Sequence, residues 1–228
     1  MRSTFLKFKI DPAGESKNIP KLVRLAGKDI LTSDLRRKYS KISRKELSSE
    51  IAKLHEGNKE QFTKIKLVYE KIWKRVGKDY IKCIEKILDH KLKDEKICYI
   101  VPSLYANIAD VLGKRNVFIV AAEVQQSPLD YILLHELTHL YYAEIIDKLN
   151  IPAAGESPLM EGVDHLILFK SPIKKLFYRI KYNEVNFVKT NSKFMAELEE
   201  HWINRKNFES FLKEAIKIQS KFPNVVIC

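Results

Sequence analysis

Two histidines and a glutamate in this chain have the spacing of a metal-binding site. They lie in the segment YILLHELTHLYY, residues 131–142, as His135, Glu136 and His139. Because a helix repeats every 3.6 residues, both imidazoles would share one helix face, with Glu136 about 100° around from His135. Imidazole nitrogen is a common zinc ligand, and a neighbouring carboxylate can act as a general base towards water at the metal.

The flanking residues predict the helix that this spacing requires. Ser127 is suited to the N-cap, Pro128 to the first helical position and Asp130 to the first turn. Apolar residues then recur every three or four positions, and Asn150 and Pro152 end the run. We therefore expect one helix over residues 128–149. A helix that carries two histidines by coincidence is the alternative interpretation.

A catalytic zinc site needs a third protein ligand and one open coordination position. Glu161 is the candidate, because Ser157-Pro158 predicts a second helix that begins just before it. The first helix continues for about 15 Å beyond His139, a distance that the following eight-residue loop can span in return. Glu156, in that loop, and His165 are the alternative third ligands.

An H-E-x-x-H motif followed by E-G-x-x-[DH] on a second helix resembles the gluzincin branch of the zincin metallopeptidases. The resemblance covers about residues 97–170. It implies one Zn²⁺ per chain, held by His135, His139 and Glu161, with Glu136 as general base and general acid.

One position departs from the family pattern. Gluzincins usually have an acid four residues after the ligand glutamate, hydrogen-bonded to a zinc histidine. In this chain that position is His165, and Asp164 precedes it. We expect one of these two residues to orient a metal ligand from behind.

The resemblance also implies an edge strand that aligns the substrate just before the motif helix. The sequence predicts strands at residues 97–101 and 116–122. The second strand takes this role, with Val120, Ala121 and Ala122 placed to pair with an extended peptide. The oxyanion of the reaction needs a further donor. The candidate donors are His165, Tyr178, Tyr182 and His201.

The predicted fold is α+β and mostly helical: a zincin-like catalytic core with a small mixed sheet and an active-site helix. Residues 5–10 are predicted as a short strand. Two regions are expected, a basic and mainly helical one over residues 1–95 and a zincin-like one over residues 96–228, or one continuous domain. Predicted helices cover residues 47–54, 62–76, 81–92, 171–180, 192–203 and 208–222, with breaks at Gly57-Asn58 and Gly77.

The net charge of +12 lies entirely in the first 100 residues, which contain 26 Lys and Arg against 14 Asp and Glu. An anionic partner such as nucleic acid is one interpretation. A solvated helical surface is the other, and we favour it because the lysines are spread around several helices and no nucleic-acid motif appears.

Three cysteines without close spacing, Cys83, Cys98 and Cys228, argue against a disulfide framework and favour a reducing, cytoplasmic setting. No apolar run is long enough for a membrane span. The sequence therefore predicts a zinc-dependent peptidase acting on a peptide or protein substrate. The alternatives are a non-catalytic zinc protein that binds an anionic partner through its basic helices, a zinc site that no longer turns over, and a latent processing enzyme.

Overall fold

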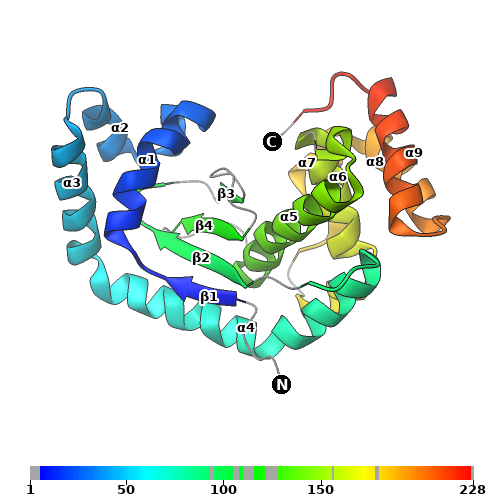
Figure 1. Ribbon diagram of the computed structural model, residues 1–228, viewed down its shortest axis with the longest axis horizontal. Coiled ribbons are helices and arrows are strands. Elements are labelled where there is room, and N and C mark those ends of the chain that lie inside the picture. The colour runs from blue at the N-terminus through cyan, green and yellow to red at the C-terminus, as the bar shows by residue number, and fades with distance from the viewer. Residues whose placement is uncertain are drawn as a thin grey trace. The chain divides into compact units, whose positions relative to one another are not determined.

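The computed structural model describes residues 6–92, 95–104, 108–109, 116–121, 128–155, 157–177 and 180–226 (Figure 1). These residues are mostly helical and contain one small sheet, which confirms the predicted α+β class. The α-helices are α1 (Pro12–Ala26), α2 (Ser33–Tyr39), α3 (Arg44–Gly57), α4 (Lys59–Ile87), α5 (Leu129–Leu149), α6 (Ser157–Phe169), α7 (Asn186–Thr190), α8 (Ser192–Ile203) and α9 (Phe208–Lys221). Short 3-10 helices cover Lys28–Ile30, Pro152–Gly155, Pro172–Leu176 and Tyr182–Glu184.

The sheet has four strands in the order β1-β2-β4-β3. Its strands are β1 (Leu6–Lys9), β2 (Lys96–Val101), β3 (Ile108–Ala109) and β4 (Val117–Ala121). The first three neighbours, β1, β2 and β4, run parallel, and β3 is antiparallel to β4. The predicted mixed sheet, with strands near residues 5–10, 97–101 and 116–122, is thus confirmed in its described part.

The prediction that the strand over residues 116–122 lies at a sheet edge is wrong at Phe118 and Ile119, which β2 and β3 flank on both sides. Strand β4 lies between β2 and β3, and its Val120 and Ala121 pair with β2 and are 0% and 2% exposed. Ala122 lies outside the described residues. The edge on this side is β3, a two-residue strand that is too short to show the alternating pattern by which strands are recognised.

The chain divides into two compact units. The first comprises Met1–Arg75 and Asp94–Glu136, and the second comprises Val76–Lys93 and Leu137–Cys228. This division does not coincide with the predicted boundary at residue 95, because β1 from the N-terminal region is hydrogen-bonded to β2. Helices α4 and α5 each begin in the first unit and end in the second.

The first unit has its own apolar core between the sheet and the N-terminal helices. Helices α1 and α3 lie side by side next to the sheet (Figure 1). Helix α3 begins with a capping box, in which Ser43 and Glu46 bond to each other's backbone N–H groups. The core residues are Ile19, Leu22, Leu31, Leu35, Leu47, Ile51, Val101, Leu104 and Ile119.

A buried polar cluster joins three elements inside this unit. The Glu15 carboxylate on α1 lies with Oε2 2.5 Å from His55 Nε2 on α3. Its Oε1 accepts hydrogen bonds from the hydroxyl and the backbone N–H of Ser103, just after β2. Glu15 and His55 are both 6% exposed. The carboxylate therefore exchanges its hydration for three specific donors, and it is tolerated in the core only because they are present.

We expect His55→Ala to lower the free energy of unfolding by about 2–4 kcal/mol, since it leaves a buried carboxylate short of one donor. Urea denaturation at neutral pH measures this. Lys53→Ala, which removes an exposed partner of Glu50 from the same helix, is the matched control and should behave like wild type. Equal stability of the two variants would contradict the importance of the buried cluster.

Two predicted helix boundaries are wrong. Helix α4 runs unbroken through Gly77, because the cost of about 1 kcal/mol for a helical glycine is outweighed by burial of neighbours such as Val76 and Tyr80. Residues 172–176 form only a 3-10 helix, and Phe177 then turns extended and packs edge-on against Phe169. Of the helices that the structure describes, none combines the length and the apolar character needed to cross a bilayer.

Candidate metal centre

Helices α5 and α6 carry every side chain of the predicted metal site. Helix α5 covers Leu129–Leu149 and α6 begins at Ser157, as the sequence predicts. His135 and Glu136 lie in one turn of α5 and His139 in the next, and Glu161 lies in the second turn of α6. Ser127, the predicted N-cap of α5, lies outside the described residues.

The three predicted ligands come together. One ligand atom each from His135, His139 and Glu161 lie within 4.8 Å of one another. The closest measured pair is His139 Nε2 and Glu161 Oε1, 3.3 Å apart. Two atoms bound at about 2.0–2.1 Å to a tetrahedral zinc are about 3.3–3.4 Å apart, so this pair has the separation of two ligands of one ion. The side chain of Glu161 is 22% exposed, whereas His139 is buried.

No family model, no curated protein and no solved structure matches this chain.

Glu136 lies in a buried and electrostatically coupled position. Its side chain is 6% exposed. Burial raises the pKa of the Cys98 thiol on β2 well above its usual range, and the nearby charge of Glu136 raises it further. The pKa of Tyr69 on α4 is likewise raised, first by burial and then by the charges of Cys98 and Glu136. Glu136 is therefore near enough to Cys98 on β2 and to Tyr69 on α4 for its charge to act on both groups.

Asp164 and His165 complete the cluster from α6. Both are fully buried, at 0% and 2% exposed. One ligand atom each from Asp164, His165 and His135 lie within 4.8 Å of one another, and His165 Nε2 lies 3.9 Å from Glu161 Oε2. The structure thus brings both residues that the sequence singled out for a supporting role to the predicted ligands.

Two tyrosines that sequence reasoning did not select contact the motif. Tyr80 on α4 shares a 2.9 Å hydrogen bond with Thr138, inside the H-E-x-x-H string. Tyr131 stacks on His135 with ring centroids 5.5 Å apart. Tyr131 stands four residues before His135, so its contact was available from helical spacing. Tyr80 is 58 residues from its partner in the chain, so the sequence around either residue does not predict that contact.

The glycine that follows Glu161 permits a close approach between helices. A Cβ atom at Gly162 would lie 2.8 Å from Leu198 Cδ1 and 3.1 Å from Phe194 Cε1, both on α8. Helix α8 therefore packs directly against the turn of α6 that carries Glu161. A side chain at residue 162 would therefore force Leu198 and Phe194 to move, and this close packing accounts for the glycine after Glu161.

Two other predicted catalytic candidates have their described contacts elsewhere. Tyr182 packs against Phe169 and under Lys170, at the end of α6, and Phe169 is about 12 Å along the helix from Glu161. His201 lies on α8 near Glu214, whose pKa is lowered chiefly by a hydrogen bond from Lys217, with a smaller contribution from His201. The remaining candidates Tyr178 and Glu156 lie outside the described residues, as does Cys228.

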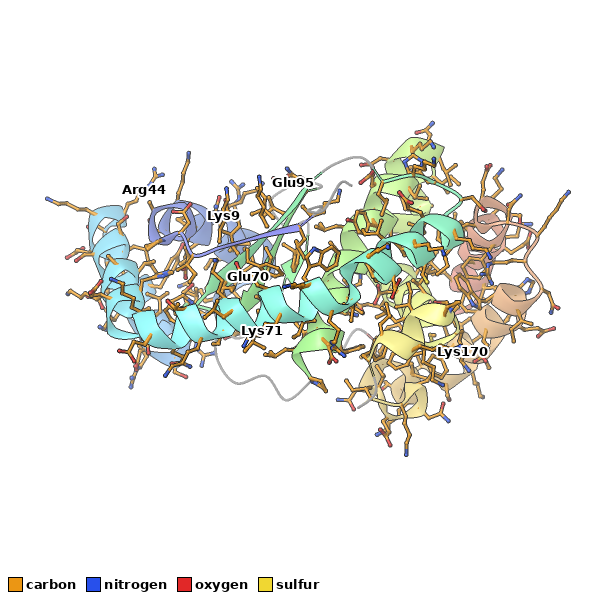
Figure 2. The ribbon with its side chains drawn as sticks, turned by 90° about the horizontal axis from the view of Figure 1, so that it is seen from below. Lys9, Arg44, Glu70, Lys71, Glu95 and Lys170 are labelled. Atoms are coloured by element: carbon orange, nitrogen blue, oxygen red, sulfur yellow. The ribbon has the colours of Figure 1, made fainter. Side chains whose placement is uncertain are left out.

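The positive charge of the first 100 residues is distributed over several elements. Figure 2 shows Lys9 on β1, Arg44 at the start of α3 and Lys71 on α4, all of them exposed. Other cations are neutralised locally, as in the pairs Lys38–Glu50 and Lys66–Glu70. This arrangement favours a solvated surface over a dedicated nucleic-acid interface.

Proposed function

We propose that this protein is a zinc-dependent peptidase of the gluzincin type, with His135, His139 and Glu161 as zinc ligands. The observation that carries this proposal is the convergence of these three side chains, with ligand atoms within 4.8 Å of one another. Glu136 directly follows the ligand His135 on the same helix. Two neutral imidazoles and one carboxylate form a donor set known from catalytic zinc sites. The 3.3 Å separation of the His139 and Glu161 atoms fits a single shared ion.

A zinc ion in this site would supply an open coordination position and lower the pKa of water there towards about 7. Glu136 takes the proton from the attacking water and later gives it to the leaving amine. Asp164 supports His135 from α6, in the role that the gluzincin pattern gives to the acid one residue later.

The peptide substrate binds in extended form along β3, the edge strand of the described sheet. Strand β4 is paired on both sides at Phe118 and Ile119, so it has no free edge there. An added strand would hydrogen-bond to the outer edge of β3, in the way that many proteins bind extended peptides. This placement replaces the role that the sequence analysis gave to residues 120–122.

Metal removal tests the proposed function directly. Protein purified without added zinc should contain about one zinc per chain and hydrolyse unfolded protein substrates. A chelator should abolish hydrolysis, and stoichiometric zinc should restore it. Mock-treated protein passed through the same steps is the control. A protein that takes up no zinc, or one that hydrolyses equally well without it, would refute the proposal.

A further inference from the structure

His165 occupies the position where the gluzincin pattern has an acid, and its surroundings are those of a fixed residue. It lies one helical turn after Glu161 on α6 and is 2% exposed. Its ring packs against Phe187 and Phe169, with centroids 5.5 Å and 6.3 Å away. Aromatic contacts on this scale restrict the orientation of the imidazole, so its Nε2 has a defined direction.

The carboxylate of Glu161 lies between two histidines. Its Oε1 is 3.3 Å from His139 Nε2, and its Oε2 is 3.9 Å from His165 Nε2. The 3.9 Å separation is that of an ion pair and is longer than a direct hydrogen bond, and rotation about the terminal bond of a glutamate is soft. A carboxylate that binds a metal through one oxygen leaves the other oxygen as an acceptor, and His165 is the donor on that side.

We propose that His165 is a positioning residue for Glu161, an inference that rests on the metal site of the proposed function. Its Nε2–H group donates to Oε2 and leaves Oε1 for the metal. Glu161 needs such support because its side chain is partly exposed, whereas His139 is buried in the helix pair. In this chain the residue four positions after the ligand glutamate therefore orients the carboxylate ligand, instead of a histidine ligand as in the gluzincin pattern.

Zinc affinity measured by competition with a chelator tests this role on the full-length chain. We expect His165→Ala to weaken zinc binding by about 10–100-fold, the usual effect of removing a residue that orients a ligand. His165→Gln should recover most of the affinity, because its amide N–H can replace the Nε2–H group. His90→Ala, which removes a histidine paired with Glu144 and Lys148 in the same unit, should bind zinc like wild type.

Cobalt substitution separates positioning from ligation. Because His165 is not a ligand in this proposal, the cobalt absorption band of His165→Ala should keep the intensity and position of wild type. A change in the position and intensity of the band in both His165→Ala and His165→Gln would show that the metal had lost a ligand. His165 would then bind the metal itself, and the inference would be overturned. Zinc affinity within about twofold of wild type in both variants would overturn it as well. Circular dichroism checks that each variant is folded, and His165→Gln decides the matter if the alanine variant is not.

The outcome for His165 is distinguishable from the outcome for the peptidase function. If wild type binds zinc and hydrolyses peptides, and the His165 variants bind zinc with unchanged affinity, the proposed function stands and the role of His165 is refuted. If wild type binds zinc but hydrolyses nothing, and His165→Ala binds zinc more weakly, the role of His165 stands and the peptidase function is refuted.

Discussion

Glu136→Gln is expected to retain zinc and to lose hydrolysis by about 10²–10⁴-fold, the usual contribution of a general base. The reason is the separation of roles on α5: His135 and His139 share the ligand face, and Glu136 lies about 100° around the helix from His135, beside the ligands rather than among them. An amide in place of the carboxylate keeps the shape of the side chain but cannot accept a proton at neutral pH. Metal content and kcat/KM on one unfolded substrate measure the two effects.

Glu144→Gln is the matched control for this prediction. It makes the same chemical change two helical turns later on α5, where Glu144 lies near His90. It should leave both zinc content and hydrolysis close to wild type. Loss of zinc in Glu136→Gln would instead show that Glu136 is a zinc ligand. Unchanged hydrolysis in this variant would show that Glu136 is not the general base.

Glu161→Ala is expected to weaken zinc binding by more than about 100-fold, beyond the range produced by residues that only orient ligands. Removal of one ligand leaves two histidines on one helix, which is too few for a closed or a catalytic zinc site. Elemental analysis after purification without added zinc should give about one zinc per wild-type chain and far less for the variant.

Glu184→Ala, which removes an exposed carboxylate paired with Lys181, controls for the general loss of an acid from this unit. It should bind zinc like wild type. Zinc retained in Glu161→Ala but lost in Glu156→Ala would move the third ligand into the loop, which the sequence analysis kept as an alternative. Zinc absent from every form, including wild type, would identify the motif as a helix with two incidental histidines.

The parts of the site that follow from local spacing could be predicted from the sequence. His135 and His139 share a face because any helix places residues four apart together, and Ser157-Pro158 announced the start of α6. The parts that depend on tertiary contacts could not. The Tyr80–Thr138 hydrogen bond joins residues 58 positions apart, and the close contact of α8 side chains with Gly162 has no signal near Gly162 in the sequence.

The same distinction applies to the fold. Strands β2 and β4 were predicted because each contains a continuous run of apolar residues, but β3 has only two residues and pairs with β4 on the side that was expected to be free. The break predicted at Gly77 rested on helix propensity, a weak preference that burial on α4 overrides. The N-cap predicted at Ser171 is present, but the helix ends within two turns, where Phe177 becomes extended and packs against Phe169.

The position of β1 has a consequence for how the protein emerges during synthesis. Leu6 of β1 pairs with Lys96 of β2, 90 residues later. At a translation rate of about 5–20 residues per second, β1 waits roughly 5–18 s for its partner. During that time the apolar side chains Leu6 and Phe8 have no sheet to cover them. Lys7 and Lys9, which alternate with them along the strand, keep the waiting segment charged and so oppose its pairing with other nascent chains.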